Sequence, residues 1–121
     1  MEEITYIKEP NPLACGQAVL SMLTNTPVEK IIELCGTQKE TDLATMKRVL
    51  NLFNMELKGK STAAVISDLP DIAVLSLETP RCWHWSLYCK GTVYDPEHGI
   101  LSDFPECARK YYFEVTKKPD C

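Results

Sequence analysis

The stretch CWHWSLYCKGTVYDPEHG, residues 82 to 99, predicts a β-hairpin and with it the sheet half of the fold. Aromatic and β-branched side chains dominate both arms of the stretch, which is typical of strands. Lys90 and Gly91 lie between the arms as a two-residue turn. With this turn, Tyr88 lies opposite Val93, and the register of the whole hairpin follows by counting outward.

The counted register brings a histidine and a carboxylate together. Ser86 lies opposite Asp95, so His84 is a diagonal neighbour of Asp95 on the same sheet face. A carboxylate in that position can bind one imidazole nitrogen and fix the tautomer of the ring. Trp83 and Trp85 point to the other face and are expected to be packing residues. A slip of one residue would separate the pair, so this prediction depends on the turn.

Outside the hairpin, apolar runs bounded by turn residues predict the remaining strands. The second half of the chain is expected to contain a short strand in MELKG (55–59), a short helix in STAAVISDL (61–69), a buried strand in DIAVLSLE (71–78) and a last strand in KYYFEVTKK (110–118).

The first half of the chain follows a short extended arm, residues 1 to 8, and has helical periodicity. Helices are predicted from residue 14 or 15 to about 25, from Thr26 to Gly36, and from about 41 to 54. Thr26, Pro27 and Glu29 suggest a capped start with a capping box, and Gly36 is a natural stop. Helices first and an antiparallel sheet second indicate an α+β fold, in one domain over residues 1–121.

Composition narrows the class of protein. The chain has 121 residues, 45% apolar and 25% charged, with a net charge of −4, which is normal for a globular domain and disfavours nucleic acid as a partner. The acidic start MEEITYIKEP does not resemble a signal peptide, and no run is apolar enough to span a membrane. We therefore expect a cytoplasmic protein whose six cysteines are reduced thiols.

One of these cysteines lies where a helix begins. In PNPLACGQAVLSMLT, residues 10 to 24, the two prolines prevent helix formation and Cys15 follows them at the helix start. The helix dipole favours an anion there and lowers the pKa of a thiol. Together with His84 and Asp95, Cys15 would form a cysteine-hydrolase triad. Gly16 leaves room for a substrate, and the Cys15 N–H could bind an oxyanion.

The motifs ACGQAVLSML, HW and VYDP, in this order and spacing, resemble the papain-like cysteine peptidases that cleave double-glycine leader peptides, the bacteriocin-processing peptidase-like family. The resemblance spans roughly residues 5 to 100 and implies a papain-like fold and a bacterial or phage setting. It implies that Cys15 is the nucleophile, His84 the general base and acid, and Asp95 the orienting residue. The implied reaction is peptide or isopeptide hydrolysis through a thioester, on an extended substrate with small residues at the scissile bond, and no cofactor is expected.

The chain departs from the family pattern at one position. These peptidases usually carry a glutamine six residues before the cysteine, and its amide donates to the oxyanion; here that residue is Glu9. An ionised glutamate cannot donate and would repel the developing charge. Asn11, four residues before Cys15, is an alternative donor, whereas Gln17 lies within the helix and is expected to point elsewhere.

Other functions remain open from the sequence alone. The protein could bind a peptide without cleaving it, which the Glu9 substitution favours, or use the same triad for deamidation or acyl transfer. A zinc site could be drawn from Cys82, His84, Cys89 and His98, but the spacing matches no common zinc motif, and no metal is predicted. A redox role is disfavoured because the chain has no C-x-x-C pair.

Overall fold

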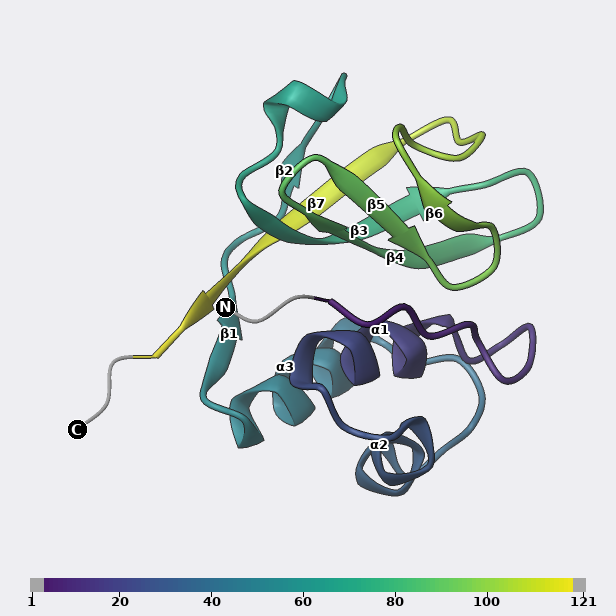
Figure 1. The fold of residues 1–121 in the computed structure, drawn as a ribbon, viewed down its shortest axis with the longest axis vertical. Coiled ribbons are helices and arrows are strands. Elements are labelled where there is room, and N and C mark those ends of the chain that lie inside the picture. The colour runs from purple at the N-terminus through teal and green to yellow at the C-terminus, as the bar shows by residue number, and fades with distance from the viewer. Residues whose placement is uncertain (1–3, 119–121) are drawn as a thin grey trace.

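The computed structural model describes residues 4–118, which form a layer of helices against one face of an antiparallel sheet (Figure 1). Residues 1–3 of the expected N-terminal arm and Cys121 lie outside this range. The elements are α1 (Cys15–Thr24), α2 (Val28–Cys35), α3 (Leu43–Leu52), β1 (Met55–Leu57), β2 (Ser61–Thr62), the 3-10 turn η1 (Ile66–Asp68), β3 (Ile72–Glu78), β4 (Trp83–Cys89), β5 (Thr92–Asp95), β6 (Gly99–Leu101) and β7 (Lys110–Lys117). The predicted α+β class, with helices before strands, is confirmed.

The sheet has the order β1-β7-β3-β4-β5-β6, with β2 also paired to β7. All pairs are antiparallel. The last strand, β7, therefore lies beside β3 and carries the chain back across the middle of the sheet to β1 (Figure 1). Within residues 4–118 none of the helices has the length and apolar character needed to cross a bilayer.

The hairpin register predicted from the Lys90-Gly91 turn is confirmed. Tyr88 pairs with Val93, and Cys89 pairs with Thr92. Lys90 and Gly91 both have positive φ angles, 46° and 93°. This is the combination that a type I′ hairpin turn needs, and it fixes which side chains of β4 and β5 share a face.

The predicted helix ends are confirmed to within two residues, but the predicted capping box is wrong. Pro27 itself is the residue before α2, with a ψ of 141°, and no side chain caps this helix. The Thr26 hydroxyl donates instead to the Thr24 carbonyl at the end of α1, at 3.2 Å. Because the link between α1 and α2 is short, the Thr26 hydroxyl bonds to the end of α1 and not to the start of α2.

The prediction for residues 61 to 69 is also largely wrong. The segment contains the two-residue strand β2 and only a three-residue 3-10 turn, η1. Pairing of Ser61 with Tyr112 recruits the first part into the sheet. The Asp68 carboxylate accepts hydrogen bonds from the Ala64 and Val65 N–H groups and closes the turn locally. Strand β6, which the sequence did not predict, follows the turn after Asp95 and pairs with β5.

Apolar side chains cover both faces of the sheet, in two clusters. The helical layer contributes Val19, Leu20, Ile31, Met46 and Val49 to a cluster with Val74, Leu87 and Phe113 of the sheet. On the other face the cluster contains Ala73, Leu75, Leu77, Tyr88 and Val93, covered by residues such as Leu69, Phe104 and Tyr112. Each fully buried side chain of this size contributes about 1.5–3 kcal/mol, so the sheet is held from both sides.

Gly16 marks the closest contact between α1 and the loop before α3. A Cβ at this position would lie 1.9 Å from the Thr41 Oγ1 and 3.1 Å from the Trp85 Cδ1. The Trp85 indole N–H donates to the Thr41 carbonyl at 2.8 Å, which holds the loop in this place. Packing against Thr41 and Trp85 therefore requires glycine after Cys15.

We predict that Gly16→Ala lowers the free energy of unfolding by roughly 1–3 kcal/mol, because the new methyl group overlaps the Thr41 side chain. Urea denaturation of the wild type, Gly16→Ala, Thr41→Ala and the double variant measures the coupling between the two positions. Thr41→Ala should recover part of the loss. A Gly16→Ala variant as stable as the wild type would contradict the close contact.

Candidate active site

Cys15 is the first residue of α1 and lies against strand β4. The residue before it, Ala14, supplies no capping side chain, so the first N–H groups of the helix have no side-chain acceptor there. Cys15 is 8% exposed as a residue, and its Sγ accepts a hydrogen bond from the Trp85 backbone N–H at 3.4 Å. Cys15 at the start of α1 and Trp85 in β4, 70 residues apart in the sequence, are therefore in contact next to His84.

His84 and Asp95 form a buried pair on the face that the hairpin register predicts. The His84 Nε2 lies 3.0 Å from the Asp95 Oδ1 and 3.1 Å from its Oδ2. Both residues are buried, and Asp95 is 0% exposed. Because Nε2 faces the carboxylate, the other ring nitrogen, Nδ1, is left for Cys15.

The Asp95 carboxylate is also the centre of a wider network. The Ser86 hydroxyl donates to its Oδ2 at 3.0 Å. The backbone N–H groups of Glu97 and His98 donate to its Oδ1, both at 2.9 Å, and the His98 Nδ1 lies 3.0 Å from the same oxygen. The sequence reasoning missed these partners of Asp95. The signals were present, since Ser86 lies opposite Asp95 in the counted register and an Asp-Pro turn favours bonds to the next N–H groups.

The network shifts the pKa values of both buried groups. Burial alone would raise the pKa of Asp95, but the hydrogen bond and positive charge of His84, with the N–H groups of the turn, lower it to about 2. Burial alone would lower the pKa of His84, but the hydrogen bonds and negative charges of Asp95 and Cys15 raise it to about 10. The site therefore favours a positively charged imidazolium at His84, beside Cys15.

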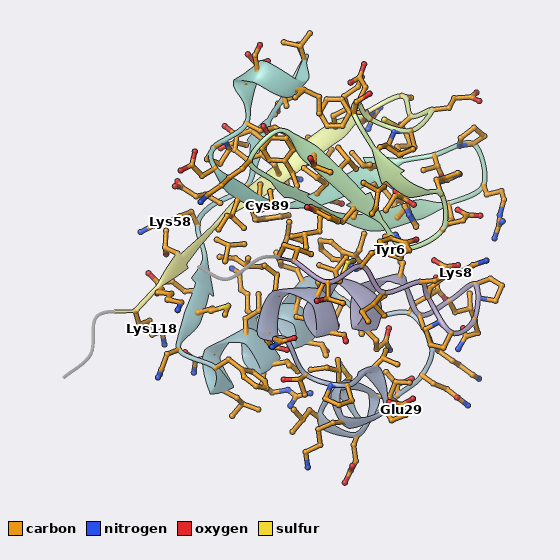
Figure 2. The ribbon with its side chains drawn as sticks, in the orientation of Figure 1. Tyr6, Lys8, Glu29, Lys58, Cys89 and Lys118 are labelled. Carbon is orange, nitrogen blue, oxygen red and sulfur yellow. The ribbon has the colours of Figure 1, made fainter. Side chains whose placement is uncertain are left out.

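The N-terminal arm crosses between α1 and the sheet and holds the turn after β5 (Figure 1). The Tyr6 hydroxyl donates to the Asp95 carbonyl at 2.6 Å, and the Glu9 N–H donates to the Pro96 carbonyl at 3.0 Å. Figure 2 shows Tyr6 and Lys8 on this arm, where it passes below the sheet. The arm thus connects the residues before Cys15 to the backbone beside Asp95.

Both candidate amide donors are occupied by the loop before α3. The Asn11 amide donates to the Gln38 carbonyl at 3.0 Å, and its oxygen accepts from the Leu13 N–H at 2.8 Å. Gln17 is fully buried, and its amide donates to the Thr37 and Lys39 carbonyls at 2.9 and 2.7 Å. The expectation that Gln17 points elsewhere is confirmed, and Asn11 is likewise committed to holding the loop.

A small cleft opens beside the pair of Cys15 and His84. Its volume is about 170 Å³, and its lining is Cys15, Glu40, Thr41, Ser76, Trp83, His84 and Trp85. The Trp85 ring packs in the helix-facing core, as expected. Trp83 differs from its expected packing role, because it is 49% exposed and stacks on Tyr111 at a ring separation of 5.8 Å.

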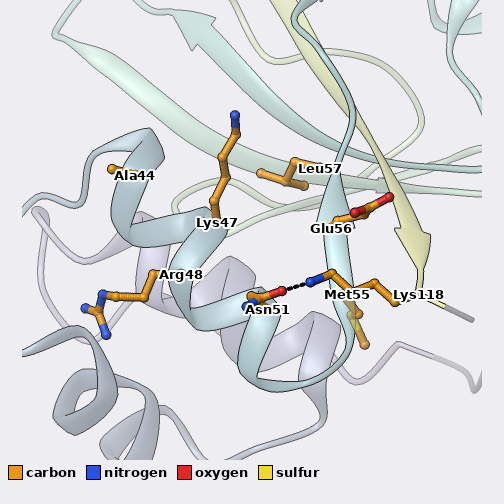
Figure 3. A pocket seen from close by; sticks show the side chains of 8 residues that line it. All are labelled: Ala44, Lys47, Arg48, Asn51, Met55, Glu56, Leu57 and Lys118. Atoms are coloured by element: carbon orange, nitrogen blue, oxygen red, sulfur yellow. Dashed lines mark hydrogen bonds between the residues drawn. The ribbon is translucent and has the colours of Figure 1, made fainter. Parts of the chain in front are cut away.

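A larger hollow of about 390 Å³ lies between α3 and β1 (Figure 3) and shares no residue with the cleft. Lys118 donates to the Asn51 Oδ1 across it. Its lining residues are Ala44, Lys47, Arg48, Asn51, Met55, Glu56, Leu57 and Lys118. None of these side chains is a nucleophile paired with a base, so we locate the candidate chemistry in the smaller cleft.

The four-residue zinc set considered from the sequence is not assembled in the described part of the chain. The groups there whose ligand atoms lie within 4.8 Å of one another are His84, Glu97 and His98, without Cys82 or Cys89. The Asp95 carboxylate already binds one nitrogen of each histidine. The five cysteines among residues 4–118 are free thiols.

Comparison with solved structures identifies the fold. The peptidase domain of Streptococcus ComA, a bi-functional ABC transporter involved in quorum sensing, is similar over 96% of this chain and 100% of that domain, with a TM-score of 0.69 and 13% identity. The chain has the fold of the double-glycine peptidase domains. A double-glycine motif protease from an AMS/PCAT transporter, solved with its leader peptide, shares this peptidase fold over 92% of the chain and 91% of its own, with a TM-score of 0.63 and 15% identity. No family model and no curated sequence matches the chain.

The opposed pKa shifts predict how Asp95 contributes to stability. The contribution of Asp95 is full above its ordinary pKa of 3.8 and is lost as pH falls through about 2. The contribution of His84 is full below its ordinary pKa of 6.5 and is lost as pH rises through about 10. Asp95→Asn should therefore lower the melting temperature most between pH 4 and 6.5, and progressively less outside that window. Thermal unfolding of both proteins across pH tests this, and a difference independent of pH would contradict it.

Proposed function

We propose that the protein is a cysteine peptidase or isopeptidase that cleaves an extended peptide through Cys15, His84 and Asp95. The observation that carries the proposal is the position of Cys15 at the start of α1, beside a buried His84 whose other nitrogen binds Asp95. These are the elements of a thiol hydrolase: a nucleophile, a base within reach, and a group that orients the base. The shared fold with peptidase domains supports the same reaction class.

In the proposed mechanism the resting pair is a Cys15 thiolate and a His84 imidazolium, stabilised by Asp95. The thiolate attacks the scissile carbonyl carbon, and the carbonyl electrons move to the oxygen, which the Cys15 N–H can bind at the helix start. The tetrahedral intermediate collapses as His84 gives its proton to the departing amine, and a thioester remains on Cys15. Neutral His84 then removes a proton from water, which attacks the thioester and releases the acid and the thiolate.

The proposed substrate is a peptide segment with small residues next to the scissile bond. The cleft beside Cys15 has a volume of only about 170 Å³, and the Thr41 and Trp85 side chains limit its width. The similar double-glycine motif protease was solved with its leader peptide, which makes a peptide the first ligand to test here. Deamidation or acyl transfer would use the same thioester and differ only in the group that forms or accepts it.

A second candidate is a domain that binds such a peptide without cleaving it. Glu9, in place of the glutamine expected six residues before Cys15, is the feature that favours it. Both candidates predict peptide binding, so binding alone does not separate them. Only the reactivity of Cys15 and cleavage of the peptide do.

We predict that iodoacetamide at neutral pH alkylates Cys15 faster than Cys82, although Cys82 is exposed and Cys15 is 8% exposed. An imidazolium neighbour makes a thiolate at Cys15, whereas exposure alone would favour Cys82. Mass spectrometry of the digested protein measures both rates in one sample, with Cys82 as the internal reference. His84→Ala should remove the preference for Cys15. Faster labelling of Cys82 in the wild type would reject the proposed thiolate pair.

We also predict that the wild type cleaves a synthetic peptide after a Gly-Gly pair, and that Cys15→Ser abolishes the cleavage while retaining the binding. Asp95→Asn should lower kcat by roughly two orders of magnitude or more, because the His84 tautomer is no longer fixed. Chromatography of the products and calorimetry of peptide binding are the two readouts. Binding of equal strength to wild type and Cys15→Ser, without product from either, would favour the second candidate.

A further inference from the structure

Glu9 carries a buried carboxyl oxygen with no partner. Its Oε1 is shielded from solvent and lacks a hydrogen bond in the described residues, while its backbone N–H is tied to the Pro96 carbonyl. A buried oxygen without a donor is costly for an ionised carboxylate, which needs several donors. A protonated carboxyl group has a lower requirement, and it also carries an O–H that can donate.

The burial of Glu9 and its surroundings together favour its neutral form. Burial, first, and the negative charges of Glu97 and Asp95 raise the pKa of Glu9, while His84 and Arg81 act in the opposite direction. Arg81 is exposed and already paired with Glu97, its Nη1 lying 2.8 Å from the Glu97 Oε2. Five titratable or charged groups face Glu9. They are Tyr6 on the N-terminal arm, Arg81 in the β3–β4 loop, His84 on β4, Asp95 on β5 and Glu97 in the turn after β5.

The side-chain amides near Cys15 are engaged with the loop before α3. Asn11 and Gln17 each donate to carbonyls of residues 37 to 39. Glu9 has the spacing of the expected glutamine and is anchored beside Asp95 through Pro96. The Gln17 Oε1 is also buried without a partner, but an amide oxygen cannot donate, whereas a protonated Glu9 carboxyl group can.

We propose that Glu9 acts as a neutral carboxylic acid whose O–H donates a hydrogen bond to the oxyanion formed on acylation of Cys15. This inference rests on the proposed function, because it needs Cys15 to attack a carbonyl group. It makes Glu9 a replacement for the glutamine amide, with one difference. An amide donates at any pH, whereas a carboxyl group donates only while it holds its proton.

The step balances without a further reactant. The Cys15 sulfur forms a bond to the carbonyl carbon, the π electrons move to the oxygen, and the Glu9 O–H and the Cys15 N–H bind that oxygen. On collapse the electrons return, the bond to the leaving group breaks, and Glu9 keeps its proton. With an ester such as 4-nitrophenyl acetate, the leaving group departs as 4-nitrophenolate and Cys15 becomes a thioester.

A pH dependence follows from the loss of this proton. Below the raised pKa of Glu9 the donor is present, and above it the donor is replaced by a negative charge that repels the oxyanion. The pKa of His84, about 10, keeps the thiolate pair formed well into the alkaline range. Acylation of the wild type should therefore decline at a lower pH than loss of the His84 proton would explain.

The test compares two reactions of the same thiolate. Acetylation of Cys15 by 4-nitrophenyl acetate passes through an oxyanion, whereas alkylation by iodoacetamide is a displacement at carbon that forms none. The ratio of the two rates at Cys15, measured by mass spectrometry from pH 4 to 9, cancels the thiolate fraction and isolates oxyanion stabilisation. We expect the wild-type ratio to fall by roughly tenfold or more as pH rises, since one oxyanion donor is worth about a hundredfold in favourable cases.

Three variants test the assignment to Glu9. Glu9→Gln should give a ratio independent of pH and at least equal to the wild-type value at high pH. Glu97→Gln removes a charge that raises the pKa of Glu9 and frees Arg81, so the wild-type decline should shift to lower pH. Glu29→Gln, the same chemical change at an exposed site on α2 (Figure 2), should match the wild type.

The outcomes separate this inference from the proposed function. If Cys15 is alkylated faster than Cys82 but the wild-type ratio is flat, or Glu9→Gln declines like the wild type, the role of Glu9 is wrong and the peptidase proposal stands. If Cys15 shows no enhanced alkylation, both proposals fail. If Glu9→Gln does not fold, Glu97→Gln still tests the inference. A decline shifted to lower pH supports the role of Glu9, and the absence of any shift overturns it.

Discussion

The buried carboxylate of Asp95 is the interaction on which the rest of the site depends. It accepts hydrogen bonds from Ser86 of β4 and from two N–H groups of the turn after β5, and it binds a nitrogen of His84. Removing one of these partners would leave a buried charge incompletely paired, which costs several kcal/mol. The charge of Asp95 therefore holds each of these groups in place. The same network explains why His84 keeps its proton although it is buried. Structure and candidate chemistry therefore rest on one carboxylate.

The other half of the site depends on the start of α1. Asn11 and Gln17 hold the loop of residues 37 to 39 against this helix. Thr41, which follows this loop, packs against Gly16. These hydrogen bonds fix the loop that leads into Glu40 and Thr41, two residues of the cleft lining. The segment before Cys15 is instead bonded to the backbone beside Asp95. The two halves are thus joined twice, by the thiol against β4 and by the arm against the turn.

The parts of the fold that follow local rules were predictable. The Lys90-Gly91 turn determines the hairpin register by counting, because side chains alternate strictly between faces, and Gly36 ends α2 as its left-handed φ of 76° allows. Residues 61 to 69 were mispredicted because pairing with β7 outweighs a weak helical preference. Trp83 was expected to be a packing residue, but it is 49% exposed and its ring stacks on Tyr111 of the distant strand β7. The errors occur where a distant strand competes with a local tendency.

By itself the sequence determined the order of helices and strands, the face shared by His84 and Asp95, and the place of Cys15 at a helix start, because periodicity, turn chemistry and proline act over a few residues. Only the tertiary structure decided what surrounds Glu9 and which carbonyls occupy Asn11 and Gln17. Those contacts join residues 20 to 90 positions apart, such as Glu9 with Pro96 and Trp85 with Cys15. The burial of Glu9 and the charges around it arise from these distant contacts. A residue that from the sequence alone could not donate to an oxyanion therefore becomes a candidate donor in the fold.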